Sequence, residues 1–223
     1  MRILVPAAIA ILSATPALAQ TREDERLWIN LTATGSIGDK LLYFAEAQPR
    51  LRDGGGELDQ LLLRPAIGWK LNNTLSLYQG YARVVNNPAS GPDRFEDRSF
   101  QQANIGVGKV GPGALSFRFR MEQRWLNDGN DTGWRARAMA RYALPLSEGG
   151  TKLLGWAEPF VALNDTDWGA RKGFDQLRSF IGVELPAGGK STVELGYLNQ
   201  WIDRPARARD VNHILSVTVF VRP

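Results

Sequence analysis

The only histidine of the chain, His213, is the one residue that could act as an imidazole base in a hydrolase. It stands in the segment DVNHILS, near Asp210, Asn212 and Ser216, and these residue types form Ser–His–Asp and related catalytic sets. Successive side chains of a β-strand point to opposite faces, so Asn212 and His213 do not form an adjacent catalytic pair. We therefore assign no catalytic residue and rank a hydrolytic enzyme below the other functions.

Two further motifs resemble ligand sites only superficially. Asp165 and Asp167 in NDTDWG could hold a cation, but aspartates in loops are more often turn formers. The segment GVGKVGPG at 106–113 lacks the Gly-Lys-Ser/Thr ending of a phosphate loop. The chain has no cysteine, which excludes thiolate metal sites, and one histidine cannot form a His-rich site. The sequence predicts neither a metal nor another cofactor.

A third pattern consists of charges rather than reactive groups. In LSFRFRMEQRW, residues 115–125, a charged residue occupies every second position from 118 to 124. Arg118, Arg120 and Glu122 therefore share one face of a strand, and Phe119 lies on the other. Such a strand is typical of a membrane barrel, whose apolar face meets lipid, or of a soluble sandwich, whose apolar face is the core.

Segments with this period of two recur along the chain after residue 20, whereas amphipathic helical spacing is hard to find. Clusters of Gly, Asn, Asp and Pro separate them. Short connections such as IGDK and GPG alternate with longer polar ones such as NNPASGPDR, which is the arrangement of outer-membrane barrels. We identify eleven segments, at residues 26–36, 40–52, 58–71, 74–85, 96–110, 114–126, 134–144, 152–163, 174–185, 191–202 and 211–221.

The predicted fold is all-β, a single transmembrane antiparallel up-and-down β-barrel. Both termini of a typical bacterial barrel lie in the periplasm, so the number of strands should be even. Either the eleven segments conceal one more strand, or segment 26–36 does not span in the usual way. We favour twelve strands, with ten as the alternative.

The N-terminal residues predict export. Arg2 precedes an apolar run, and Ala17-Leu18-Ala19 forms a small-residue cleavage site, as in a secretory signal peptide. The predicted domains are therefore a signal peptide, residues 1–19, and an outer-membrane barrel, residues 20–223. No later apolar stretch reaches the roughly 18 residues of a transmembrane helix. The formal net charge of +4 is too small to predict binding to nucleic acid.

Three features favour a membrane barrel over a soluble sandwich or a soluble periplasmic barrel. They are the absence of spanning helices, the sorting of loops by length, and aromatic residues near segment ends, where interfacial girdles form. The predicted location is the outer membrane of a Gram-negative bacterium, with outer-membrane lipid, lipopolysaccharide and the barrel-assembly machinery as partners. The predicted girdle residues are Trp28, Trp69, Trp125, Trp134, Tyr142 and Trp201.

The inner faces of this barrel carry the functional prediction. Basic residues outnumber acidic ones there, and rings of Arg and Lys favour anions, so we predict a narrow pore for small anionic solutes. The alternative is a plugged barrel with a structural or interaction role, because side chains fill the interior of small barrels. A barrel-embedded lipid hydrolase ranks third. The pore-lining candidates are Glu46, Arg50, Arg64, Arg98, Arg118, Arg120, Glu122, Arg124, Arg135, Arg137, Arg141, Glu158, Arg178 and Glu194, and the same faces carry Arg52, Lys70, Glu96 and Glu184.

Several motifs together resemble one known family. They are Trp28, EAQPR at 46–50, GYAR at 80–83, RSFQQ at 98–102, RFRMEQR at 118–124, WAEPFVALND at 156–165, FDQLRSFIGV at 174–183, ELGYLNQW at 194–201 and NHILSVTVF at 212–220. With them the chain resembles the domain-of-unknown-function 2490 family of Gram-negative outer-membrane proteins. The resemblance implies an outer-membrane barrel and brings no activity, ligand or catalytic residue. Outer-membrane barrels commonly end in an aromatic residue, whereas Phe220 is followed here by Val221, Arg222 and Pro223.

Overall fold

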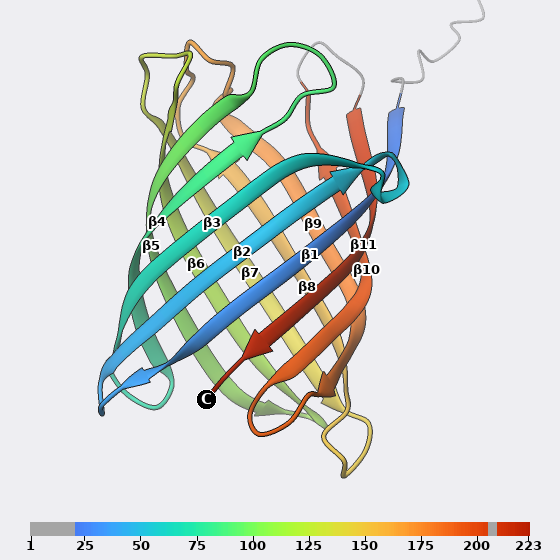
Figure 1. Ribbon diagram of the computed structural model, residues 1–223. Helices are drawn as coiled ribbons and strands as arrows, with labels where there is room; N and C mark the ends of the chain where they lie inside the picture. Colours follow the sequence, from blue (N-terminus) through green and yellow to red (C-terminus); the bar gives the residue numbers. More distant parts are fainter. Residues whose placement is uncertain (1–20, 205–208) are drawn as a thin grey trace, which may run out of the picture.

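The computed structural model describes residues 21–204 and 209–223, which form a closed β-barrel (Figure 1). The predicted signal peptide, residues 1–19, lies outside the described residues. One short 3-10 turn, η1 (Asp53–Gly55), interrupts the strands. The strands are β1 (Thr21–Ile37), β2 (Leu41–Arg52), β3 (Glu57–Lys70), β4 (Leu75–Asn86), β5 (Arg94–Val110), β6 (Gly113–Leu126), β7 (Gly133–Pro145), β8 (Lys152–Ala162), β9 (Gly173–Pro186), β10 (Thr192–Ile202) and β11 (Arg209–Val221).

Each strand coincides with one segment of period two. The ends differ from the predicted ends by at most two residues, except that β1 begins five residues earlier. Local turn chemistry explains this agreement. In the turn between β3 and β4, the side-chain oxygen of Asn72 accepts hydrogen bonds from the backbone N–H of Thr74 at 2.9 Å and of Leu75 at 2.8 Å. This side-chain mimic of a backbone turn reverses the chain within a few residues.

The barrel closes through a parallel pair, which the sequence analysis did not foresee. Consecutive strands are antiparallel, but β1 pairs with β11 in parallel, from Thr21 opposite Arg209 to Ala33 opposite Val221. Strand β1 also pairs with β2, so segment 26–36 is a full member of the wall. Parallel closure permits an odd number of strands. The described residues form eleven, and neither the favoured twelve nor the alternative ten is found.

Parallel closure also places the start of β1 and the C-terminus at opposite ends of the barrel (Figure 1). The connections at the C-terminal end are the tight ones, and we call this the short-turn end. The opposite end, the long-loop end, carries the loops 87–93, 127–132 and 163–172. The longest loops are therefore at one end, as predicted, although the β7–β8 connection 146–151 is as long as loop 127–132. The start of β1 and the end of β11 lie at opposite ends of the barrel.

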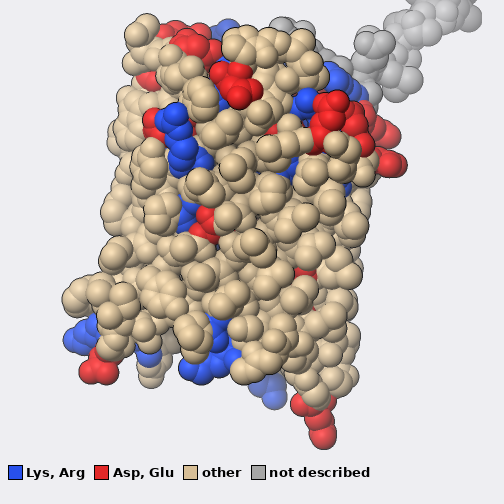
Figure 2. All heavy atoms as spheres, viewed as in Figure 1, with Lys and Arg blue, Asp and Glu red and all other residues tan. Residues whose placement is uncertain are grey.

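The exterior of the wall is largely apolar. Ile67, Phe119 and Leu215 are 58, 46 and 54 % exposed on this face. In Figure 2 the charged side chains lie mostly towards the two ends of the barrel. No helix among residues 21–204 and 209–223 is long and apolar enough to cross a membrane.

Polar side chains on the exterior bond to one another. Gln123 donates to Gln101 and Gln101 donates to Gln79, both at 2.9 Å, across β6, β5 and β4. Nearer the long-loop end of the same strands, Arg83 pairs with Asp97 at 2.8 Å. These groups therefore satisfy much of their hydrogen-bonding capacity within the wall.

One predicted girdle residue lies inside the barrel instead. Trp69, Trp125 and Trp134 are exposed near strand ends, as predicted, but Trp28 is 3 % exposed. Trp28 shares its face of β1 with the buried Thr32, four residues further along, so strand alternation directs it inward. The residue type suggested a position at the membrane interface, but the alternation of side chains along the strand places Trp28 in the lumen.

Candidate functional site in the barrel lumen

The fourteen candidate residues all point into the barrel. Cross-strand neighbours among them include Glu46 opposite Arg64 and Glu158 opposite Arg178. Their ion pairs and aromatic contacts, described below, are made with other inward-facing side chains. A role in the passage of ions remains a prediction.

Glu122 on β6 is the centre of the densest charge cluster. One of its oxygens accepts hydrogen bonds from Arg135 at 2.6 and 2.9 Å, and the other accepts one from Arg137 at 2.7 Å. Glu122 is only 1 % exposed. A buried carboxylate needs close partners and several hydrogen bonds to offset its lost hydration, and two guanidinium groups supply them.

Glu158 on β8 extends this cluster. It accepts hydrogen bonds from Arg137 at 3.0 and 3.1 Å and from Arg118 at 2.9 Å. Arg137 therefore bridges Glu122 and Glu158. Glu96, nearer the long-loop end, also binds two arginines, Arg98 and Arg124.

The remaining inward glutamates also pair with arginine, each with a single arginine partner. Glu46 pairs with Arg64. Nearer the short-turn end, Arg141 bonds to Glu194 at 2.6 Å and to Glu184 at 3.0 Å. Every inward glutamate predicted from the sequence thus has an arginine partner.

Three inward-facing arginines stack on aromatic rings, and among them only Arg120 has an ion pair with the described residues, at 3.7 Å from Glu122. The guanidinium carbon of Arg50 lies 3.9 Å from the ring centre of Trp28, and that of Arg120 lies 4.4 Å from the ring centre of Phe100. Arg178 forms no hydrogen bond or ion pair with the described residues. It lies 4.9 Å from the ring centre of Trp28 and 4.7 Å from that of Phe160. Cation–π attraction strengthens in a desolvated site, so these rings compensate part of the buried charge.

A glycine makes one of these stacks possible. Phe100 of β5 lies across Gly80 of β4, where any side chain would overlap the ring. Because the Phe100 ring lies against the backbone at Gly80, the other face of the ring is open towards the lumen and contacts Arg120.

The contact between Arg178 and Trp28 joins strands that are not neighbours in the wall. Arg178 belongs to β9 and Trp28 to β1, and two strands, β10 and β11, separate them in the wall. Phe160 then links Arg178 to Arg137, which lies 4.2 Å from its ring centre. We call this set the central layer; it comprises Trp28, Arg50, Phe100, Arg120, Glu122, Arg137, Glu158, Phe160 and Arg178.

Apolar side chains fill another part of the lumen. Trp156 and Phe180 stack with ring centres 5.4 Å apart. Phe180 belongs to a buried cluster that joins β1 to β7 through β11, formed by Trp28, Ala143, Leu154, Phe180, Leu198 and Ile214.

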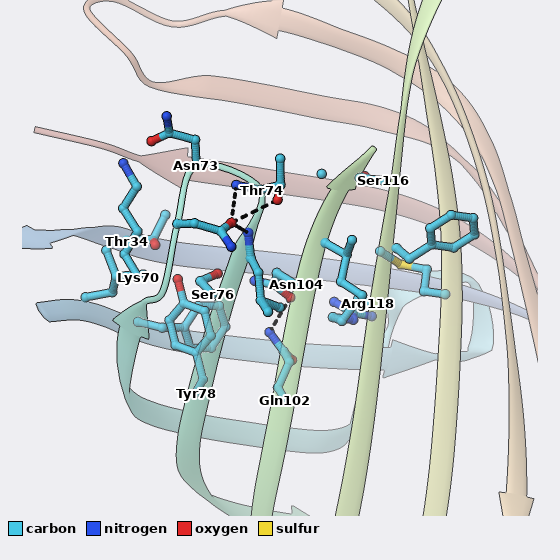
Figure 3. Close-up of a pocket in the computed structure, with 18 of the residues that line it drawn as sticks. Thr34, Lys70, Asn73, Thr74, Ser76, Tyr78, Gln102, Asn104, Ser116 and Arg118 are labelled. Carbon is cyan, nitrogen blue, oxygen red and sulfur yellow. Dashed lines mark hydrogen bonds between the residues drawn. The ribbon is translucent and has the colours of Figure 1, made fainter. Parts of the chain in front are cut away.

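A cavity of about 470 Å³ opens at the short-turn end, and we call it the recess. The 72–74 turn contributes to its rim, and β1 to β6 contribute most of its wall (Figure 3). Arg118 and Lys70 are the basic residues around it, and none of its lining residues is acidic. Hydroxyl and amide side chains make up much of the rest, among them Thr32, Thr34, Ser76, Asn104 and Ser116.

The two loop aspartates accept backbone hydrogen bonds, Asp165 within its own loop and Asp167 from loop 127–132. Asp165 accepts a hydrogen bond from the backbone N–H of Lys172 at 3.0 Å. Asp167 accepts backbone hydrogen bonds from Asn130 at 2.8 Å and Asp131 at 3.2 Å, which lower the pKa of its carboxyl. Loop 163–172 is thereby fixed to loop 127–132. Within the described ranges, no three His, Cys, Asp or Glu side chains are grouped so that they could hold a metal ion.

The residues around His213 do not come together. Its Nδ1 lies 2.6 Å from the hydroxyl of Tyr197 on the exterior. Asn212 points inward and donates to Gln200 at 3.0 Å, so the two neighbours face opposite ways, as predicted. Ser216 is a buried residue on the inward face of β11 and cannot reach His213.

Sequence reasoning missed the inward aromatic residues and the recess. Phe100 shares its strand face with Arg98 and Gln102, and Phe160 shares its face with Glu158, so strand alternation was a usable signal for both. No such signal marked Thr34 and Ser116 as neighbours, because they are far apart in the chain and meet only when β1 and β6 curve around one cavity.

The chain is similar to one protein family and to a curated relative. The family described as "Protein of unknown function (DUF2490)" matches residues 25–212. An uncharacterised protein of Methylorubrum extorquens is 51 % identical over 223 residues, which cover 99 % of this chain and 97 % of the relative. No solved structure matches the chain. Since the match spans most of the sequence, the chain belongs to the DUF2490 family.

Proposed function

We propose that the protein is an outer-membrane β-barrel whose lumen is closed by the central layer, so that it is not an open anion pore. The observation that carries this proposal is the burial of Glu122 and Glu158, at 1 and 2 % exposure, in arginine bridges inside the barrel. The proposal corresponds to the plugged alternative of the sequence analysis.

The exterior supports the membrane location. A closed sheet pairs its backbone groups within the wall, which the hydrocarbon core of a bilayer requires. Large apolar side chains cover the outside, and burying them in lipid removes them from water. The exterior glutamines and the Arg83–Asp97 pair bond within the wall, which lowers the cost of placing them in lipid.

The central layer supports a closed lumen. An ion passing through this layer would meet the Arg178–Trp28 contact and the arginine bridges at Glu122 and Glu158. Breaking a buried ion pair leaves an uncompensated charge, which costs about 3–5 kcal/mol. A steady aqueous path through this layer is therefore unfavourable.

Planar-bilayer recording tests the proposal. We expect the unmodified barrel to conduct no steady current under a salt gradient. Arg178→Ala should introduce current, because it removes the side chain that joins β9 to Trp28 and leaves no carboxylate unpaired. The reversal potential of that current should indicate anion preference, because the excess of arginine remains in the lumen.

Arg171→Ala provides the matched control, since Arg171 is exposed in loop 163–172. It should leave the barrel silent. Steady conductance of the unmodified protein would instead restore the open anion pore of the sequence analysis.

A further inference from the structure

The recess differs from the rest of the lumen in that several of its polar groups have no partner, although Gln102 donates to Asn104 at 2.9 Å and Asn72 accepts from Thr74 at 2.9 Å. Lys70 forms no ion pair within the described part of the chain, and the hydroxyls of Thr34 and Ser116 form no hydrogen bonds there. In Figure 3 these side chains surround the cavity, with Lys70 and Arg118 in different parts of its wall. Such groups can bind a ligand without first breaking an internal bond.

Arg118 connects the recess to the central layer. One of its terminal nitrogens bonds to Glu158 at 2.9 Å, and its Nε is buried without a hydrogen-bond partner. Its side chain is 27 % exposed, whereas the ion-paired side chains of Arg120 and Arg137 are 2 and 5 % exposed. Arg118 therefore keeps donors available towards the cavity while the neighbouring arginines are enclosed.

Apolar and aromatic side chains complete the wall. Phe44 of β2 and Phe220 of β11 lie across from Thr34 and Thr32 of β1 in the wall pairing. Tyr78 adds an aromatic ring from β4. A ligand that fits this wall needs an apolar face as well as hydroxyl groups and a negative charge.

We propose that the recess binds a small acidic sugar, one or two rings in size, that carries a carboxylate or a phosphate. The anionic group would lie between Lys70, which has no ion pair in the described part of the chain, and the exposed part of Arg118, which also bonds to Glu158 outside the lining. The sugar hydroxyls would bond to Thr34, Asn104 and Ser116, and a ring face would pack against Phe44 or Tyr78. A cavity of about 470 Å³ lies within the roughly 300–1,000 Å³ range of small-molecule sites.

This inference rests on the proposed closed lumen, because a cavity that continued into a pore would be a vestibule for passing ions. Equilibrium binding and conductance separate the two ideas. A silent barrel that fails to bind would overturn only the recess site, whereas a conducting barrel would overturn the closed lumen.

Isothermal titration calorimetry of the purified full chain tests the site, in a detergent without a sugar headgroup. The probes are glucuronate, glucose 6-phosphate, glucose and inorganic phosphate. We expect saturable binding of glucuronate or glucose 6-phosphate. Glucose and inorganic phosphate should each bind at least about tenfold more weakly, because glucose lacks the anionic group and inorganic phosphate lacks the sugar ring. The two acidic sugars distinguish a carboxylate ligand from a phosphate ligand.

Variants locate the site. Lys70→Gln removes an unpaired cation at the rim and should weaken binding of the acidic sugar by about tenfold without affecting folding. Arg118→Gln should weaken it by at least as much, while Glu158 keeps Arg137. Lys109→Gln, at an exposed position towards the same end of β5, is the control and should change nothing.

Three results would overturn the proposal. They are equal affinity for glucose, binding that inorganic phosphate reproduces in full, and binding that survives Lys70→Gln unchanged.

Discussion

The central layer and the recess share one lumen and both contain arginine, yet they treat charge in opposite ways. In the central layer Glu122 and Glu158 each bind two arginines, and both carboxylates are almost fully buried. In the recess, Lys70 and Arg118 face hydroxyl and amide groups without an acidic neighbour in the lining.

The difference teaches that an excess of arginine does not by itself make a path or a site for anions. Where carboxylates satisfy the arginines, the charges join β6, β7 and β8 on the inside of the wall and are enclosed away from solvent. In the recess, Lys70 has no ion pair within the described residues and Arg118 is partly exposed beside its bond to Glu158, so donors remain for a ligand. The following predictions test this comparison, from the largest expected effect to the smallest.

Glu122→Gln should have the largest effect. It removes a charge that compensates Arg135 and Arg137, and breaking a buried ion pair costs about 3–5 kcal/mol. Urea unfolding of the barrel in lipid vesicles, followed by tryptophan fluorescence, measures the loss of free energy of unfolding.

Two controls sharpen the comparison. Glu57→Gln changes an exposed partner of Arg52, and exposed pairs contribute only about 0–1 kcal/mol. Lys70→Gln in the recess removes no ion pair and should leave the free energy of unfolding unchanged. If Glu122→Gln were no more harmful than these two, the central layer would not hold the barrel together.

Phe119→Arg should have the next largest effect. Phe119 lies at the middle of β6 on the exterior, between the inward-facing Arg118 and Arg120. An arginine on the lipid face near the bilayer midplane costs about 2–4 kcal/mol. The same urea titration in vesicles measures this cost, and Phe119→Leu controls for the lost aromatic ring.

Arg118→Ala provides the contrast on the other face of the same strand. It removes one of the two arginines at Glu158 and leaves Arg137, so the free energy of unfolding should fall less than for Phe119→Arg. Equal tolerance of the two changes would mean that the exterior of β6 does not face lipid.

These contrasts depend on strand facing, which the sequence predicted well. A period of two is a local property, so the inward positions of Arg118, Glu122 and Arg137 could be read without the fold. Trp28 was misplaced because its residue type was given more weight than its position in the strand.

Properties that involve distant strands could not be predicted in this way. The number of strands was wrong because it was inferred from where barrel termini usually lie, and the parallel pairing of β1 with β11 removes that constraint. The partners of each charge also depend on curvature, as when Arg141 of β7 reaches Glu194 of β10. The recess could not be predicted either, because its lining includes residues of the first strand, β1, and the last strand, β11.

The smallest effect should come from the long-loop end, where acid should loosen one loop and leave the lumen unchanged. Backbone hydrogen bonds from Asn130 and Asp131 lower the pKa of Asp167, so its carboxylate stabilises the loop contact above the unfolded pKa. This stabilisation is lost as the pH falls through the folded pKa, below the ordinary aspartate value of about 3.9.

Trp168 donates to the backbone of Asp131 at 2.8 Å and reports on the contact. The fluorescence difference between the unmodified protein and Trp168→Phe should therefore show an acid transition. Asp167→Asn should abolish that transition, whereas Asp53→Asn, at an exposed turn, should retain it. If ligand binding in the recess changed across the same acid transition, the long loops would be coupled to the recess. The contrast between the central layer and the recess would then depend on the loops as well as on the side chains that form the two parts.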